Sequence, residues 1–536
     1  MIKQLVLFSK SNKEIQNLNV YENKLVIDCS KVIETTTSFD IEIEFEVKIS
    51  SFRNHDYTWQ DVNSDRIANE YTPKIIKLAD GNYVQANMNQ GIWEVHKKNP
   101  YKLIWKFNPQ FSKPITQYVG SNVQKRIYQA NSKVAFVATP TLLFSKIGAI
   151  EISRSKIPFS AIACFTDHCD FDTLDNLKVQ RQLFSETNIK VTKGFFINHF
   201  SKRNDNASHE NDKQELDLWQ ANGHEMCYHS LSQSIKSDNE SFSDFEKFTN
   251  PYSSEVWIDH GYQPYNFSLF KNHPKLESTY ETLLKQKDVK ILWNYIDSGT
   301  ATTGVINQLN GNHFTLNSFL KGNKNLSTMK LMQAMIKNIV FHYLNEEKII
   351  TNYKATAQNF KKIVFQRKFK IIPKFIKDFA ILFSSIASVL LFWNSKKNKI
   401  FKLSKYTPLF FKHTILNEEF VVFQTLEMID FSKSLQESNI NLLIKEAGIF
   451  IAHTYFSDSV AYHEGKMLTK DNAIEKQVAI NFNYLGLKIA ENKIWNPTLS
   501  ELVSYFEVLD QTVISFDENG KFVLNNNQLV PVRMIK

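Results

Sequence analysis

The sequence predicts an α/β protein that carries a separate β-rich domain at its N-terminus. Strand-like segments with period-two alternation occupy residues 1–155, and short apolar runs alternate with helix-like stretches over 156–510. Alternating β and α segments form a parallel sheet or a barrel. A basic segment, residues 321–412, interrupts this alternation as an insertion. The chain of 536 residues has room for roughly two to four domains.

The N-terminal region is expected to form an antiparallel sandwich or a similar module. Over residues 39–48, apolar side chains alternate with acidic ones, which is typical of a half-exposed strand. A turn is expected at 80–82 and a further strand at 101–107. The region carries no cluster of catalytic residue types, so a structural role is favoured over a carbohydrate-contacting one.

From residue 156 onward, strands and helices are expected to follow one another. We predict strands at 161–166, 191–197, 224–228, 291–297 and 448–453, and helices around 173–187 and 212–222. Thr498 and Glu501 have the spacing of a capping box and predict the start of a helix. Residues 511–536 contain Asn519-Gly520 between apolar runs and predict a C-terminal β hairpin.

The basic segment accounts for the net positive charge of the chain. Residues 321–412 hold 19 Lys and Arg against three acidic residues, a net charge of +16, whereas the whole chain has +9. Its uncharged run over 379–393 is shorter than the ~20 residues that a membrane-spanning helix needs. An amphipathic helical insertion that contacts an anionic membrane through residues 365–400 fits this pattern. A buried hairpin with a solvated basic rim is the alternative. No nucleic-acid partner is expected, because the aromatic residues are clustered rather than interleaved with the basic ones.

Cysteine usage and the first residues suggest a reducing compartment. Of four cysteines, Cys164, Cys169 and Cys227 lie beside histidine and carboxylate residues, unlike a secreted disulfide framework. The N-terminus lacks the apolar core and cleavage site of a signal peptide. We therefore expect a cytoplasmic protein that is peripheral at the inner face of the cell membrane.

Two polar clusters follow apolar runs. One is Asp167-His168-Cys169-Asp170, and the other is the segment 223–230, which contains His224, Glu225 and His229. Because strand ends meet at one edge of an α/β sheet or barrel, both clusters are expected at an active site. Imidazole and carboxylate groups suit Zn²⁺, so the sequence predicts a divalent-metal hydrolase site.

These clusters, with a third motif, resemble the motifs of the polysaccharide deacetylase family (NodB homology, carbohydrate esterases). Residues 165–170 are similar to that family's Thr-Phe-Asp-Asp motif, and 223–230 match its Gly-His-Glu-x-x-x-His-Ser motif. Residues 451–454 are similar to its Leu-x-His motif, and the order of the three is the same. The resemblance covers roughly 158–510 and implies a distorted (β/α) barrel of the NodB type.

The resemblance also implies catalytic roles. Asp167 corresponds to the general base, although the register of the motif leaves Asp170 and Asp172 open for that role. His453 would be the acid that protonates the leaving group. Asp297, at the end of a predicted strand, is a candidate for orienting a catalytic group.

For the metal, the resemblance implies His229 as a ligand, together with Asp170 or His168. The second histidine of the family motif would fall at Gln233, so one ligand is missing or replaced. His168, Asp170 and His260 are the candidates to replace it.

The Arg-x-Pro motif of the family has no clear counterpart. In its place stands a separate cluster over 257–264, which contains Asp259 and His260. Asp259 is a candidate catalytic residue and His260 a candidate metal ligand; a tight structural loop is the alternative. His224 is expected to be a scaffold residue, as the resemblance implies for the Gly-His-Glu segment.

The function predicted from these features is that of a metal-dependent carbohydrate deacetylase, with Zn²⁺ as the expected cofactor. It would remove an acetyl or other acyl group, by cleaving a C–N or an ester bond, from a sugar of a bacterial surface glycan or its lipid-linked precursor. One alternative is a catalytically inactive glycan-binding protein, since two family motifs are altered. The other is an enzyme that acts on an amide other than a sugar.

Overall fold

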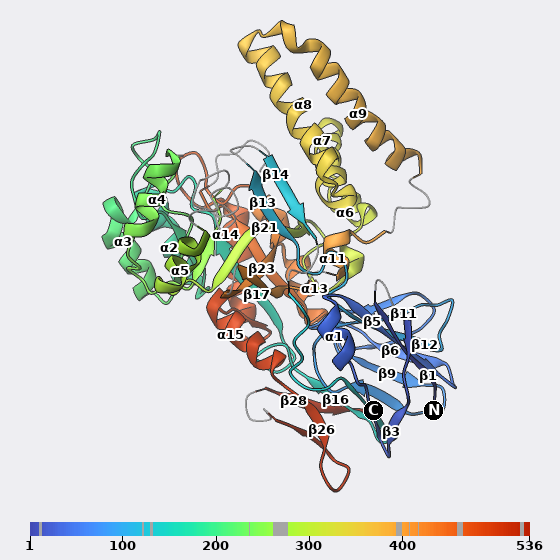
Figure 1. The fold of residues 1–536 in the computed structure, drawn as a ribbon. Helices are drawn as coiled ribbons and strands as arrows, with labels where there is room; N and C mark the ends of the chain where they lie inside the picture. The colour runs from blue at the N-terminus through green and yellow to red at the C-terminus, as the bar shows by residue number, and fades with distance from the viewer. Residues whose placement is uncertain are drawn as a thin grey trace.

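The computed structural model describes the chain except for ten short stretches. These are residues 10–12, 120–122, 129–131, 235, 261–276, 393–398, 407, 416–417, 458–464 and 526–529. The part 261–264 of the predicted cluster and the part 393–398 of the predicted membrane-contacting segment therefore lie outside the described residues. An N-terminal β domain, a central α/β unit and a projecting pair of helices make up the chain (Figure 1).

The N-terminal domain consists of two antiparallel sheets that share one core. The first sheet has the order β2 (Lys13–Ile15), β1 (Ile2–Ser9), β5 (Phe39–Phe45), β12 (Lys102–Phe107), β11 (Ile92–Val95), β8 (Arg66–Ala68). The second has the order β3 (Asn19–Tyr21), β4 (Lys24–Val26), β15 (Thr141–Ser145), β10 (Tyr83–Ala86), β9 (Ile75–Leu78), β6 (Ile49–Arg53), β7 (Trp59–Asp61). Helix α1 (Ser30–Thr35) lies between β4 and β5. The predicted β-rich domain is confirmed.

Strand β5 shows why these residues form a sandwich. Its burial alternates strictly between buried apolar residues and partly exposed polar ones, as the period-two pattern predicts. Gly81, with φ +88°, makes the turn between β9 and β10, a conformation that favours glycine. The predicted alternating strand and the predicted turn at 80–82 are therefore confirmed. The acidic residues of β5 face basic residues of β12, as in the 2.6 Å ion pair of Lys102 with Glu42.

Seven parallel strands form a closed barrel after this domain. Their order around the barrel is β17 (Ala161–Asp167), β18 (Thr192–Phe195), β19 (Glu225–Tyr228), β20 (Val256–Ile258), β21 (Ile291–Thr300), β23 (Glu418–Glu427), β24 (Ile449–Thr454). Strand β18 pairs with β17 through Thr166 and Thr192 only. The first residues of β17 pair instead with the short β25 (Ile494–Trp495), which leaves an irregular seam. The prediction of a (β/α) barrel is confirmed at this level.

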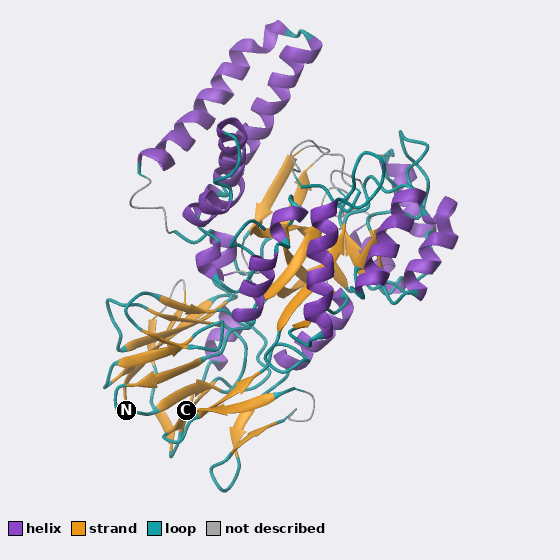
Figure 2. Cartoon of the chain, turned by 180° about the vertical axis from the view of Figure 1, so that it is seen from behind, coloured by secondary structure: helices purple, strands orange, loops and turns teal. Residues whose placement is uncertain are grey.

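Helices surround the barrel (Figure 2). They are α2 (Leu174–Thr187), α3 (His209–Ala221), α4 (Asp238–Lys247), α5 (Glu277–Gln286), α12 (Phe431–Ser434), α13 (Glu437–Lys445), α14 (Lys476–Ala490) and α15 (Leu499–Asp510). The predicted capping box is present, since the Thr498 side chain accepts from the Glu501 amide and the Glu501 side chain accepts from the Thr498 amide. The amides of Leu499 and Ser500 also donate to Glu225 at the start of β19, which anchors α15 near the amino-terminal end of the barrel.

The alternation of each barrel strand divides its residues between two cores. Phe165, Trp257 and Leu292 belong to the core that contains the surrounding helices. Ile258 and Trp293 belong to a second core, inside the barrel and against α15. The face on which a residue lies therefore decides whether its side chain can reach the barrel mouth.

Part of the basic segment forms a pair of helices that projects from the molecule (Figures 1 and 2). Helix α6 (Leu316–Gly322) leads into the segment, which contains α7 (Thr328–Asn338), α8 (Glu347–Gln366), α9 (Ile372–Leu391) and α11 (Lys402–Tyr406). A short 3-10 turn (Gly311–His313) precedes α6, a π-helical turn (Ile339–Leu344) follows α7, and a second 3-10 turn (Phe369–Ile371) precedes α9. The pair α8 and α9, residues 347–391, is called the arm below. None of the described helices has the length and apolar composition needed to cross a membrane.

The remaining strands tie the C-terminal segment back to earlier parts of the chain. The predicted hairpin is formed by β26 (Ile514–Phe516) and β27 (Phe522–Leu524), with Gly520 at φ +72° in its turn. Strand β28 (Val532–Ile535) pairs with β16 (Ala149–Ile152). The hairpin β13 (Ile115–Val119) and β14 (Val123–Ile127) stands beside the barrel, and β22 (Phe410–Ile415) pairs antiparallel with β23.

Candidate metal centre

Four histidines gather at the carboxyl ends of the barrel strands. His168, His229 and His260 follow β17, β19 and β20, and His453 lies within β24. Each histidine lies an even number of residues from the residues of its strand that face the barrel interior, so it lies on that same face. The ring of His168 lies 4.0 Å from that of His453 and 4.7 Å from that of His229, and the ring of His229 lies 4.8 Å from that of His260. The alternation of four strands thus builds one imidazole cluster.

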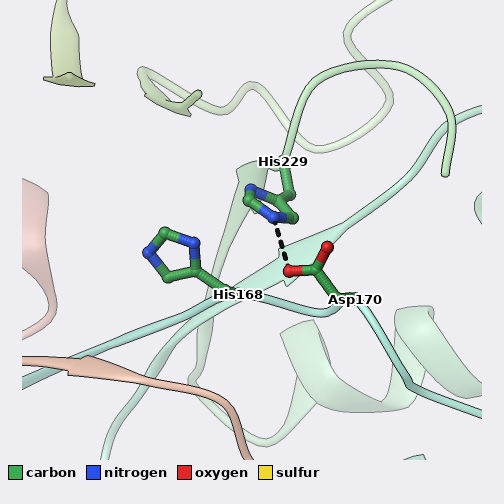
Figure 3. A group of neighbouring side chains, drawn as sticks. All are labelled: His168, Asp170 and His229. Atoms are coloured by element: carbon green, nitrogen blue, oxygen red, sulfur yellow. Dashed lines mark hydrogen bonds and ion pairs between the residues drawn. The ribbon is translucent and has the colours of Figure 1, made fainter. Parts of the chain in front are cut away.

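Asp170 joins this cluster from the loop after β17. Ligand atoms of His168, Asp170 and His229 all lie within 4.8 Å of one another (Figure 3). The His229 Nε2 is 3.0 Å from Asp170 Oδ2, and the His260 Nε2 is 2.5 Å from Asp170 Oδ1. Two imidazoles and one carboxylate are a donor set of catalytic zinc sites.

The two nitrogens of His229 both face hydrogen-bond acceptors. Its Nδ1 lies 3.2 Å from the carbonyl oxygen of Ile258, while its Nε2 faces Asp170. A neutral imidazole carries one proton and can donate to only one of them. If Nδ1 donates to the carbonyl, the Nε2 lone pair and the carboxylate both point at a position that suits a cation. This is also the arrangement in which a metal-ligating histidine is oriented by a backbone carbonyl.

Burial and charge set the protonation of the ligand atoms. Burial lowers the pKa of His168 well below its usual value, and the neighbouring histidines lower it further. Burial also lowers the pKa of His229, against the opposing effect of Asp170. Burial by itself would raise the pKa of Asp170, but its electrostatic interactions and hydrogen bonds with His260 and His229 hold it well below its usual range. Neutral imidazoles and an ionised carboxylate are the forms that bind metal.

Three further nitrogens in the cluster are buried without a hydrogen-bond partner. They are His168 Nε2, His260 Nδ1 and His453 Nε2, within the part of the chain that the structure describes. A buried ring nitrogen without a partner is costly, so its presence in a native fold calls for a ligand, a water or an ion. The donor set and these nitrogens together fit a divalent metal ion held by His168, Asp170 and His229.

His453 is held by the Asp297 carboxylate, which is held in turn by a hydroxyl on the strand between them. Its Nδ1 lies 3.1 Å from Asp297 Oδ1, and the Thr425 hydroxyl donates to that same oxygen at 2.7 Å. The Trp293 indole donates to Thr425 at 2.8 Å, and its ring lies 4.7 Å from that of His453. The predicted orienting residue Asp297 therefore does contact a predicted catalytic residue.

Asp167 does not join the cluster, because it lies on the opposite face of β17 from His168. It is fully buried and forms an ion pair with Lys193, which also pairs with Asp172. Gln180 completes the group by donating to Asp172 and accepting from Lys193. Burial, together with the charge of Asp172, raises the pKa of Asp167 to about 7 against the opposing effect of Lys193. The expected base and its alternative Asp172 are thus parts of a buried ion-pair network.

Asp259 is likewise separated from the cluster by strand alternation. Its carboxylate accepts from the Trp257 indole at 3.2 Å and from the Asn294 amide at 2.9 Å, both on the helix-facing side. Its neighbour His260 lies on the other face and contacts Asp170. Of the two residues predicted from this segment, only His260 reaches the candidate metal centre.

Other residues of the predicted motifs serve the scaffold. The His224 Nδ1 accepts from the Val191 amide at 3.3 Å, in agreement with its expected role. Gln233, at the position of the family's second histidine, accepts from the amide of Phe200 and donates to the carbonyl of Ala207. Sequence reasoning missed Lys193; a lysine inside an otherwise apolar strand was its signal.

Comparison with known proteins leaves the family of the chain open. The chain matches no protein-family model and no curated protein. Among solved structures, it is similar to a dextranase of glycoside hydrolase family 31 from Flavobacterium johnsoniae, complexed with glucose, at 8% identity and a TM-score of 0.28. That match covers 100% of this chain and 73% of the dextranase. A mutant of the same enzyme with isomaltotriose gives the same identity and TM-score, with coverage of 99% and 70%.

Proposed function

We propose that the protein is a metal-dependent hydrolase that removes an acyl group, most simply acetyl, from a sugar. The observation that carries the proposal is the His168–Asp170–His229 group, whose ligand atoms lie within 4.8 Å of one another at the mouth of the barrel. The motif resemblance to polysaccharide deacetylases supports the reaction type and the sugar substrate. The NodB type of the barrel is part of the same proposal.

His168, Asp170 and His229 would hold the ion, and His260 supports Asp170 through its second oxygen. Zn²⁺ is proposed because nitrogen and carboxylate donors suit it. When bound, such an ion polarises the acyl carbonyl and lowers the pKa of a water molecule. The Ile258 carbonyl orients His229 for this task by accepting from its Nδ1.

His453 would move the proton. Since Asp297 accepts from its Nδ1, the neutral ring presents the Nε2 lone pair to the cluster. Nε2 takes a proton from the attacking water, whose oxygen forms the bond to the acyl carbon. The imidazolium then gives that proton to the sugar nitrogen or oxygen as the bond to the acyl carbon breaks. Asp297 stabilises the imidazolium between the two transfers, as a carboxylate does in a catalytic triad.

The test is the release of acetate from acetylated amino sugars and from acetylated sugar esters, with and without added Zn²⁺. We expect metal-dependent release by the wild-type protein and a loss of at least about a hundredfold in His453→Ala. His209→Ala, on α3 and outside the cluster, is the matched control and should retain the rate. Glycan binding without acetate release by the metal-loaded protein would favour the inactive binding protein instead.

A further inference from the structure

The arm exposes far more apolar surface than a solvated helix pair requires. On α9, five outward residues recur at helical spacing: Ile372, Ile376, Phe379, Phe383 and Leu390. The apolar positions Leu382, Ile386 and Val389 are already buried, so this outer stripe is a second apolar face. On α8 and at the turn, Phe360, Val364, Phe365 and Phe369 are exposed as well.

This apolar surface is continuous rather than scattered. Phe360, Phe375, Phe379 and Phe383 form a row in which successive rings lie 6.2, 5.9 and 6.2 Å apart. The side chain of Phe365, near the turn, is 78% exposed. Contiguous exposed apolar surface of this kind marks a site of contact with a partner or a membrane.

Exposed cations are concentrated in the same part of the arm. Between residues 360 and 379 they are Lys361, Lys362, Arg367, Lys368, Lys370, Lys374 and Lys377. Asp378 is the one acidic residue in that range, and it accepts from Asn359 at 3.2 Å within the arm. Two copies of such a tip repel each other, whereas an anionic surface is complementary to it.

We propose that the arm docks the protein on an anionic membrane by lying in the headgroup region. Its phenylalanine and isoleucine side chains would enter the boundary of the acyl chains, and its lysines would reach the lipid phosphates. A spanning arrangement does not fit, because none of the described helices is long and apolar enough to cross. This docking goes beyond the proposed function and does not depend on it.

A groove lies between the arm and the carboxyl end of strand β23. It has a volume of about 790 Å³ and is lined by Phe341 and Phe360, by Lys354, and by Glu427 at the carboxyl end of β23. Glu427 is paired in register with His453. Docking through the arm would therefore place an apolar path, lined also by lysines, between the lipid surface and the strand end beside His453. This path fits an amphiphilic glycan whose lipid end remains in the membrane, an assignment that rests on the proposed function.

Vesicle flotation of the full-length protein tests the docking. We expect binding to vesicles of phosphatidylcholine with phosphatidylglycerol, and binding that is weaker by at least about tenfold to pure phosphatidylcholine. Phe379→Ser with Phe383→Ser should lower binding to the anionic vesicles by more than about tenfold. Lys368→Glu with Lys370→Glu should lower it as well, since the headgroups are negative.

The matched control is Ile480→Ser with Leu487→Ser, which removes two apolar side chains, each 51% exposed, from α14. It should bind vesicles like the wild type. Absence of binding by the wild type, or equal losses in the control and in the arm variants, overturns the proposal. Concentration-dependent dimerisation in light scattering that the arm variants abolish also overturns it, in favour of a second copy as occupant.

Two substrates separate the docking from the reaction. An acetylated sugar attached to a lipid in anionic vesicles should be hydrolysed more slowly by Phe379→Ser with Phe383→Ser, while the same sugar free in solution should be hydrolysed at the wild-type rate. Equal effects on both substrates contradict the path through the groove. Vesicle binding without hydrolysis of either substrate leaves the docking intact and counts against the proposed function alone.

Discussion

The Nδ1 atom of His453 lies 3.1 Å from the Oδ1 atom of Asp297, although the two residues are 156 positions apart in the chain. Strand β23 stands between their strands in the barrel and supplies Thr425, whose hydroxyl contacts the same oxygen. The pair is thus fixed by three parallel strands rather than by one loop. This rigid support fixes the direction in which the Nε2 atom of His453 points.

Asp297→Asn tests whether this pair carries the proton transfer. The amide can donate to Nδ1 and thereby favour the tautomer that has its proton on Nε2, which cannot accept a proton from water. We expect kcat for acetyl release to fall by roughly 10²–10⁴-fold with little change in KM. Asp175→Asn, an exposed change on α2, is the control in steady-state kinetics. A wild-type kcat in Asp297→Asn would rule out the proposed proton path.

Lys193→Met should destabilise the fold rather than change the chemistry. It removes the cation between Asp167 and Asp172, and an uncompensated buried charge costs about 3–5 kcal/mol. Lys190→Met removes the exposed pair with Glu501 and should cost less than about 1 kcal/mol. Urea unfolding measures both free energies. Similar small losses in the two variants would contradict the structural role given to the network.

Asp167→Asn separates the network from catalysis. Because Asp167 faces the helices and not the histidine cluster, the variant should lose stability but keep its kcat per folded molecule. The folded fraction is measured by circular dichroism, and kcat is measured with the metal-loaded protein at a temperature where the variant is folded. A drop in kcat of a hundredfold or more, without loss of metal, would restore Asp167 as the base.

Glu446 should make the free energy of unfolding depend on pH in the acidic range. Its oxygens accept from Asn307 and Asn310, each at 2.9 Å, and lie near His313 and His55. Burial alone would raise its pKa, but the hydrogen bonds and charges of these neighbours lower it to about 2. A carboxyl whose folded-state pKa is lowered stabilises the fold above its unfolded-state value of 4.5, and this contribution is lost as the pH falls toward 2.

Glu446→Gln should therefore unfold more easily at pH 7, by roughly 2–3 kcal/mol, and should show a flatter dependence on pH between about 4.5 and 2. Glu437→Gln, at an exposed position of α13, is the control and should follow the wild type. The measurement is urea unfolding at a series of pH values. Parallel pH curves for Glu446→Gln and the wild type would refute the assignment.

Local patterns predicted most of the barrel elements. The apolar run of β17, the helix α2 and the capping box of α15 follow from short-range periodicity and capping chemistry. The sequence did not predict β20, because a strand of three residues shows no periodicity. It also did not predict β23, which follows the basic insertion and contains both charged and apolar residues.

The candidate site could be predicted in its residue types but not in its geometry. Alternation places Asp167 and His168 on opposite faces of β17, yet only the closed barrel shows which face points to the mouth. The same holds for Asp259 and His260. The contact between His453 and Asp297 depends on strand order, which the sequence of a single chain does not specify.

The central claim is tested most directly by metal analysis of the purified protein after reconstitution with Zn²⁺. The account predicts about one ion per chain in the wild type and in His209→Ala, and loss of that ion in His229→Ala, with circular dichroism showing that all three are folded. A wild-type protein without metal, or a His229→Ala variant that retains the ion, would contradict it.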